Sequence, residues 1–184
     1  MASAHNQREA HPDQQQLNVL ALLQELGVIA NGSLSVGDAL YQSLAAIGRH
    51  TGWRLGRVKL EGAAMSLVSE PAISWSDDSA IAWPALPETV TADGSPTMVA
   101  APSGPSAGSP PLRGYVACPI HTAGQHVGLL EFLADETLQI GPELRQVLSH
   151  TATLLGLVIE RGQTQAGLRE SERCFRAISS IPRE

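Results

Sequence analysis

The spacing of apolar residues predicts two helices at the start of the chain. From Gln14 onward, large apolar residues recur every three or four positions and so mark one side of an α-helix; they are Leu17, Leu20, Leu23, Leu26 and Ile29. Asn31-Gly32 is a typical helix end, and Ser35 can cap a second helix that ends near Thr51-Gly52. The apolar positions of that helix are Val36, Leu40, Leu44 and Ile47. Residues 1–13 are polar, and we expect them to be disordered.

The pattern changes from helical to extended at Trp53. Residues 53–61, WRLGRVKLE, predict a β-strand, and residues 64–70, AMSLVSE, predict its partner across a turn at Glu61-Gly62. Residues 71–113 are harder to interpret. Within them, 97–100 predict a short strand, and 101–113, rich in Pro, Gly and Ser, predict a mobile loop.

The clearest local signal is a β-hairpin over residues 114–135. Two apolar runs flank the sequence TAGQ, which suits a tight turn. Most positions in both runs are apolar, so we expect both faces of the sheet to be covered. If Ala123-Gly124 is the turn, His121 faces His126. The two imidazoles are then surface residues, half of a metal site that lacks a third ligand, or a pH-sensitive contact.

A long helix is predicted from Pro142. Its buried stripe consists of Leu144, Leu148, Thr151, Leu155, Val158 and Ile159. Beyond Ile159 the helix turns polar, and Leu168 and Phe175 lie seven residues apart, a weak coiled-coil seam. Such a helix needs a partner. We therefore expect a parallel homodimer through the helix residues Leu155, Val158, Ile159 and Leu168.

Charge and motifs exclude several classes of function. The net charge of −6 argues against binding to nucleic acid or anionic lipid. No apolar run approaches the roughly 20 residues that span a bilayer. The two cysteines form neither a disulfide framework nor a metal motif, so a reducing, cytoplasmic setting fits. The chain has no phosphate loop, GxSxG elbow or HExxH motif, and we expect no catalytic site and no metal site.

The order helix, helix, strand, strand, variable middle, hairpin, long helix resembles the GAF domain, a sensing module of signalling proteins. CPIHTAGQHVGLLEFLAD is similar to the terminal GAF hairpin, through Pro119, Gly124, Gly128, Glu131 and Phe132. LPETVTADGSPTMV, at 86–99, resembles a GAF helix that ends before a strand. The resemblance implies an α+β fold over residues 14–160. It has a central antiparallel sheet, with the N- and C-terminal helices packed on one face.

The end of the chain resembles a second family. LRESERCFRAI is similar to the first helix of a PAS domain, through Ser171, Glu172, Phe175 and Arg176. This resemblance implies that residues 161–184 are a signalling helix that runs into a PAS domain. An output domain would follow, as in a two-component sensor kinase or a cyclic-di-nucleotide enzyme. The chain would then be a piece of a longer protein.

The resemblance to GAF domains implies a regulatory sensor that binds a small molecule and signals through its C-terminal helix. A ligand-free dimerisation module is the alternative. The candidate ligand-binding residues are Trp75, Trp83, Val99 and Cys118, although the tryptophans also suit a sheet edge. A covalent bilin on Cys118, a cyclic nucleotide and haem each lack part of their motif, so the cofactor is unknown. The segment around His150 lacks the acidic residue of a kinase phosphoacceptor.

Overall fold

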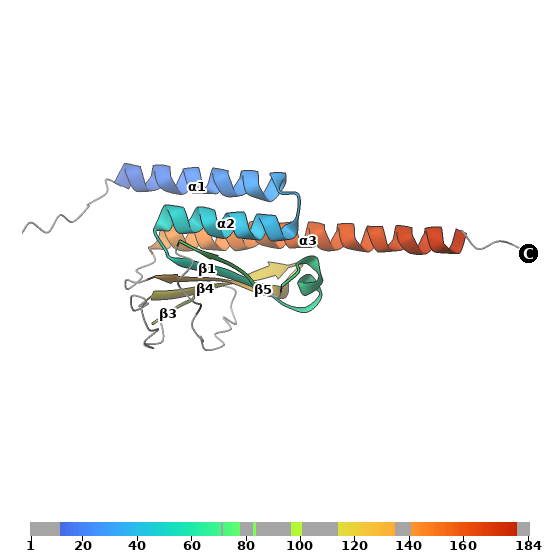
Figure 1. Cartoon of the computed structure of the whole chain (residues 1–184). Coiled ribbons are helices and arrows are strands. Elements are labelled where there is room, and N and C mark those ends of the chain that lie inside the picture. The colour runs from blue at the N-terminus through green and yellow to red at the C-terminus, as the bar shows by residue number, and fades with distance from the viewer. Residues whose placement is uncertain are drawn as a thin grey trace, which may run out of the picture.

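The computed structural model describes residues 12–70, 72–77, 83, 97–100, 114–134 and 141–179, and it has an α+β fold (Figure 1). One antiparallel sheet carries helices on one face. In chain order the elements are α1 (Pro12–Gly32), α2 (Val36–Thr51), β1 (Leu55–Leu60), the 3-10 helix η1 (Gly62–Leu67), β2 (Ala72–Ser76), β3 (Thr97–Ala100), β4 (Gly114–Thr122), β5 (Gln125–Ala134) and α3 (Pro142–Ser179).

The five strands lie in the order β2-β1-β5-β4-β3, and every neighbouring pair is antiparallel. The predicted hairpin is confirmed as β4 and β5. Its two turn residues, Ala123 and Gly124, have φ values of 48° and 78°. Positive φ at both central residues gives a turn whose twist matches that of the strands. His121 therefore faces His126, as the sequence predicts.

One predicted strand is wrong. Residues 64–70 do not pair with β1, because Gly62–Leu67 forms the 3-10 helix η1. The partner of β1 is β2, with Val58 opposite Ile73. The apolar residues of this segment do not alternate, so no strand face is defined. Only Ala64 of η1 is fully buried. The predicted strand at 97–100 is confirmed as β3, whereas the predicted loop 101–113 and residues 1–11 of the predicted tail lie outside the described residues.

The helices form two layers on one face of the sheet. α2 and α3 contact the strands, and α1 packs on the outer side of both helices (Figure 1). The predicted placement of the N- and C-terminal helices on one face is confirmed. Ser35 caps α2 by accepting a hydrogen bond from the Asp38 N–H at 3.1 Å, and Gly52 ends α2 in the left-handed region with φ 76°. Leu26 and Ile29 of the predicted α1 stripe are buried in the core, but Leu20 is 56% exposed. Leu40, Leu44 and Ile47 of the predicted α2 stripe are buried in the core.

The sheet face turned away from the helices, called the outer face here, also carries buried apolar side chains. Four of its residues are at most 2% exposed: Leu55, Tyr115, Ala117 and Leu133. Trp83 and Leu129 pack against them. The prediction that both faces of the hairpin are covered is confirmed. This burial explains why the hairpin reads as continuous apolar runs rather than an alternation.

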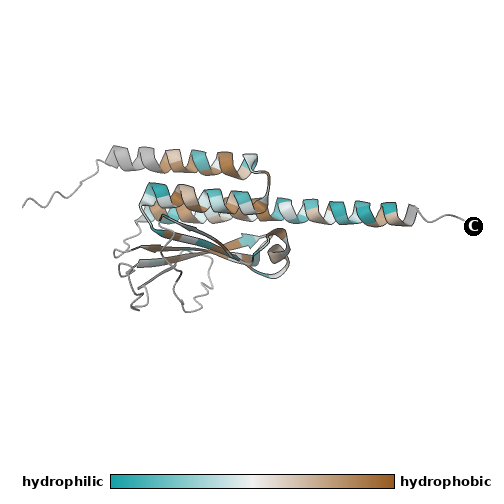
Figure 2. Ribbon diagram, in the orientation of Figure 1, coloured by the Kyte–Doolittle hydropathy of each residue, from teal (hydrophilic) through white to brown (hydrophobic). Residues whose placement is uncertain are grey.

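Helix α3 extends well past the sheet. It has 38 residues, which corresponds to about 57 Å at 1.5 Å per residue. Figure 2 shows apolar residues where α3 lies over the sheet and mainly polar ones beyond it. Residues 164–177 are exposed throughout. No helix in the described part of the chain is both long and apolar enough to cross a membrane.

Candidate functional site

A buried ion pair joins the two central strands on the outer face. Arg57 of β1 is opposite Glu131 of β5. Its Nε donates to Glu131 Oε2 at 2.7 Å, and its Nη2 donates to Oε1 at 3.0 Å. The Glu131 side chain is only 3% exposed and that of Arg57 is 18% exposed. This bidentate geometry is the strongest form of the arginine–carboxylate contact, and it fixes both side chains.

Two aromatic residues, Tyr115 and Trp83, contact this ion pair. We call the four residues Arg57, Tyr115, Glu131 and Trp83 the outer-face cluster. The Tyr115 hydroxyl donates to Glu131 Oε1 at 2.8 Å. Burial, and secondly the charge of Glu131, raise the pKa of the Tyr115 phenol well above its ordinary 10.0, so the hydroxyl stays a donor. Arg57 Cζ lies 4.3 Å from the centroid of the Trp83 ring, a cation–π contact.

The Trp83 indole N–H is the unsatisfied group of this cluster. Its Nε1 atom is buried, and no group in the described part of the chain accepts its hydrogen bond. A buried donor without a partner costs about 1–3 kcal/mol, and such groups are uncommon in proteins. Glu131, by contrast, has both oxygens engaged by Arg57 and Tyr115. The cluster therefore offers donors to a ligand rather than a base for catalysis.

Solved structures share this architecture. The free methionine-R-sulfoxide reductase of Neisseria meningitidis, in complex with its substrate, aligns with TM-score 0.60 and 20% identity over 90% of this chain and 99% of that one. The GAF domain of a phosphoenolpyruvate-protein phosphotransferase from Coxiella burnetii aligns with TM-score 0.60 and 14% identity, over 82% and 98%. That of a putative sensor histidine kinase from Pseudomonas syringae pv. tomato aligns with TM-score 0.58 and 16% identity, over 86% and 96%.

The chain has the GAF fold. Identities of this size show the fold alone. No family model matches the sequence, and no curated protein matches it. Two of these structures are GAF domains and the third is an enzyme, so the fold alone does not decide the function and the site must do so.

Within the GAF fold, the four predicted ligand-binding residues do not form one site. Trp75 packs under α2, where a Cβ on Gly48 would lie 2.0 Å from its ring. Cys118 is 1% exposed, and its Sγ donates weakly to the Leu148 carbonyl at 3.7 Å. Cys118 is therefore a core residue on the helix side, and Trp75 is partly buried against the same core, so neither belongs to the outer-face cluster. Val99 pairs with Tyr115 in the sheet. Trp83 alone among the four has its side chain shown in the outer-face cluster.

Sequence reasoning missed Arg57, Tyr115 and Glu131 as site residues. A usable signal was present, because Glu131 lies inside the apolar run GLLEFLA. A charge inside a buried strand requires a partner. The partner, Arg57, is 74 positions away in the sequence, and only the pairing of β1 with β5 brings the two together.

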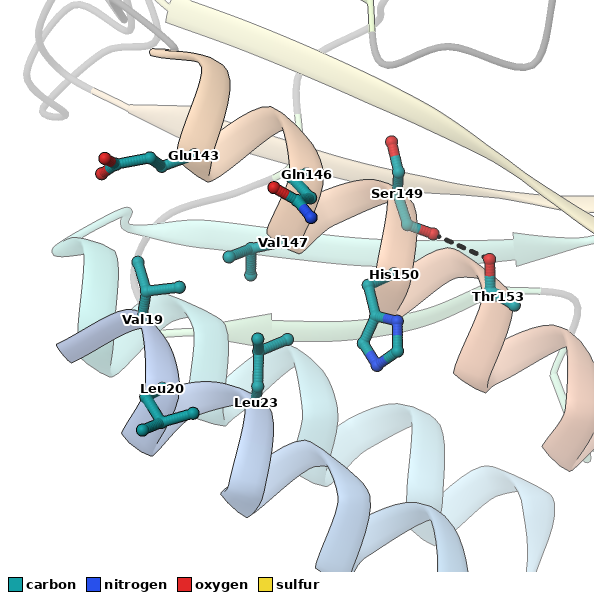
Figure 3. A pocket seen from close by; sticks show the side chains of 9 residues that line it. All are labelled: Val19, Leu20, Leu23, Glu143, Gln146, Val147, Ser149, His150 and Thr153. Carbon is teal, nitrogen blue, oxygen red and sulfur yellow. Dashed lines mark hydrogen bonds between the residues drawn. The ribbon is translucent and has the colours of Figure 1, made fainter. Parts of the chain in front are cut away.

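A groove of about 650 Å³ lies between α1 and α3 (Figure 3). Leu20 and Leu23 of α1 face Val147 and the polar side chains of Gln146 and His150 on α3. A second hollow, of about 630 Å³, lies at the start of α2 beside β2. Neither hollow is lined by the predicted ligand-binding residues. His150 is an exposed residue of α3 that lines the first groove.

The two hairpin histidines form a small surface cluster. The ring centroids of His121 and His126 are 5.6 Å apart, and His126 Nδ1 lies 3.3 Å from Glu61 Oε2. Among the described residues, no group of three or more His, Cys, Asp or Glu side chains is placed to hold a metal ion. Glu61 is thus the acidic neighbour that the sequence did not reveal.

Three of the four predicted dimer residues face inward. Leu155, Val158 and Ile159 are at most 3% exposed and belong to the core of their own domain, so they cannot also line a dimer contact. Leu168 is 62% exposed, and its role in a dimer stays a prediction. The face of α3 that packs in the core of its own domain is therefore different from the face that a second chain could contact.

Proposed function

We propose that this chain is a regulatory sensor domain that binds a small molecule on the outer face of its sheet and transmits the event through α3. The outer-face cluster is the observation that carries the proposal. A purely structural sheet would cover this face with apolar side chains, whereas here four groups that form polar contacts meet in a largely buried place. Small-molecule sites in proteins combine apolar surroundings with a few convergent polar groups, and the outer-face cluster has both.

The contacts of α3 support a path for the signal. The Cys118 thiol of β4 contacts the Leu148 carbonyl of α3. At Gly156, α3 packs so closely on β4 that an added Cβ would overlap the carbonyl oxygen of His121. β4 also carries Tyr115 on its other face. A ligand that moves β4 would therefore move α3, because packed interfaces shift as units.

A second copy of the chain is the partner that α3 would engage. The large exposed apolar residues of α3 are Leu157, Leu168 and Phe175, which are 57%, 62% and 72% exposed. Their spacings of eleven and seven place all three on the a and d positions of one heptad register. This exposed seam (Leu157, Leu168 and Phe175) replaces the inward residues Leu155, Val158 and Ile159 in the proposed parallel homodimer.

The role of the extension follows from the same helix. Residues 161–179 continue α3 without a break, which suits a signalling linker leading to a PAS domain and an output domain downstream. The two cysteines, Cys118 and Cys174, are both unpaired, in keeping with the proposed cytoplasmic setting.

A second candidate function is the reduction of a substrate by a cysteine thiol. The burial of Cys118 and the position of Cys174 argue against it. Burial raises the pKa of the Cys118 thiol from its ordinary 9.0 to about 12, so it is protonated and inaccessible. A reactive cysteine needs an accessible thiolate. Cys174 is exposed, but it lies on the extension of α3 and away from the outer-face cluster.

Native mass spectrometry of the purified protein distinguishes the sensor hypothesis from the hypothesis of a ligand-free dimerisation module. The sensor predicts a small molecule retained on the chain, and its loss when the outer-face cluster is altered. A chain that never carries a small molecule, from any extract or growth condition, would favour the module.

The homodimer is tested by oxidative cross-linking in a Cys174→Ser background. Ser171 occupies the d position between Leu168 and Phe175, so Ser171→Cys is expected to form an interchain disulfide in a parallel pair. Arg173→Cys, at the opposite f position, is the matched control and should not cross-link. Equal cross-linking at both positions, or none at Ser171→Cys, would contradict the seam.

A further inference from the structure

We propose that the outer-face cluster selects a small monoanionic carboxylate, whose oxygens accept hydrogen bonds from Arg57 and Trp83 while Lys59 supplies the balancing charge. This inference rests on the proposed function, because it names the ligand class of the same site.

The charges on β1 point to an anion. Arg57 and Lys59 alternate along β1, and their partners Glu131 and Leu129 on β5 place both on the outer face. Glu131 neutralises Arg57. Lys59 is half-buried and belongs to no ion pair in the described part of the chain, so one positive charge remains on this face. Lys59 is the only lysine of a chain whose net charge is −6.

The unused hydrogen-bond donors point to an oxygen acceptor. A guanidinium group has five N–H donors, and Glu131 uses two of those on Arg57. The buried Trp83 Nε1 has no acceptor among the described groups, and its ring lies over the Arg57 guanidinium. A carboxylate offers two oxygens to such neighbouring donors, and satisfying a buried donor recovers the free energy lost by leaving it unpaired.

The rest of the face limits the size and charge of the ligand. The apolar neighbours Leu55, Leu129 and Leu133 suit a carbon skeleton attached to the carboxylate. A phosphate monoester carries about −1.5 to −2 charges at neutral pH, which would leave uncompensated negative charge beside the buried Glu131. A monoanion leaves none.

The experiment follows the indole N–H resonance of Trp83 by two-dimensional NMR on the full chain. The chain has three tryptophans, so Trp83→Phe identifies the resonance by its disappearance. The probes are acetate, pyruvate, benzoate and phenylacetate at millimolar concentration, each compared with its neutral amide. We expect at least one carboxylate to shift the Trp83 resonance in a saturable way while its amide does not.

Lys59 gives an independent readout, because it is the only side-chain amine. The bound carboxylate should protect it from an amine-acylating reagent, as measured by mass spectrometry. Lys59→Met should weaken the binding at least tenfold, and Lys59→Arg should restore most of it. No saturable shift with any carboxylate overturns the proposal, and so does a shift that Lys59→Met leaves unchanged.

The outcomes separate the ligand class from the sensor function. A Trp83 shift produced by a neutral amide or by a phosphodiester such as a cyclic nucleotide overturns the carboxylate and leaves the sensor in place. A chain that carries no small molecule from any extract, and whose Trp83 resonance responds to no probe, overturns both.

Discussion

Arg161 of α3 donates a hydrogen bond from Nη2 to the carbonyl oxygen of Ala30, near the end of α1, at 2.6 Å. The last carbonyls of a helix have no partner within the helix and carry partial negative charge, which a guanidinium group satisfies. Arg161 lies where α3 begins to leave the domain, just before Gly162, which approaches Val36 closely. This contact therefore joins α1 to the start of the extension.

We expect Arg161→Met to lower the free energy of unfolding by about 1–2 kcal/mol, because a charged hydrogen bond to a helix end is lost. Urea denaturation measures the change. Arg169→Met, on the exposed part of the same helix, is the control and should change stability by less than about 0.5 kcal/mol. Equal effects would mean that the Ala30 contact contributes nothing.

The ion pair of Arg57 and Glu131 should be costly to break from one side. Arg57→Leu leaves Glu131 buried with only the Tyr115 hydroxyl, and we expect a loss of about 3–5 kcal/mol in urea denaturation. Replacing Arg57 and Glu131 by Leu and Tyr115 by Phe removes every polar group of the contact and should recover most of the loss. A triple variant less stable than Arg57→Leu would contradict this account.

The control for that series is the surface pair of Arg54 and Asp77, with a distance of 3.1 Å from Nε to Oδ2. The Asp77 side chain is 43% exposed, so solvent screens the interaction. Asp77→Asn should cost less than about 1 kcal/mol.

Two glycines in helices should respond to alanine with opposite sign. A Cβ on Gly48 would lie 2.0 Å from the Trp75 ring, so Gly48→Ala should destabilise the protein by about 1–3 kcal/mol. A Cβ on Gly27 of α1 would meet nothing within 4 Å, so Gly27→Ala should stabilise by up to about 1 kcal/mol. Melting temperatures of both variants test this, and Trp75→Leu should rescue Gly48→Ala if the clash is the cause.

The buried thiol of Cys118 should make stability fall at alkaline pH. Burial raises its pKa from 9.0 to about 12, so between these values the unfolded chain loses the proton and the folded chain keeps it. The folded state then binds more protons, and stability falls by about 1.4 kcal/mol per pH unit above pH 9.0. Urea denaturation as a function of pH measures this slope.

Cys118→Val should reduce that slope, and Cys174→Ser should leave it unchanged, because Cys174 is exposed. Burial and the charge of Glu131 also raise the pKa of Tyr115, so a smaller fall above pH 10.0 should persist in Cys118→Val. Equal slopes in both cysteine variants would mean that the thiol ionises as easily in the folded chain as in the unfolded one.

The sequence by itself determined the elements whose signals are local. The stripe from Leu20 to Ile29, the cap at Ser35 and the turn at Ala123-Gly124 all depend on residues within a few positions of each other. Helical spacing and turn geometry are set by neighbouring residues, so α1, α2, α3 and the β4–β5 hairpin could be predicted. The resemblance of the hairpin to GAF domains then fixed the layers.

Only the tertiary structure decided which residues that are distant in the sequence come into contact. Successive side chains of a strand point to opposite faces, so the pairing register decides that Trp75 faces α2 while Arg57 joins Glu131 on the outer face. η1 forms where a strand was predicted, because its apolar residues define no single face. Leu155 is buried against the domain and Leu168 is exposed to solvent, because α3 extends beyond the end of the sheet that it covers. Such long-range packing leaves no signal in the spacing of one segment.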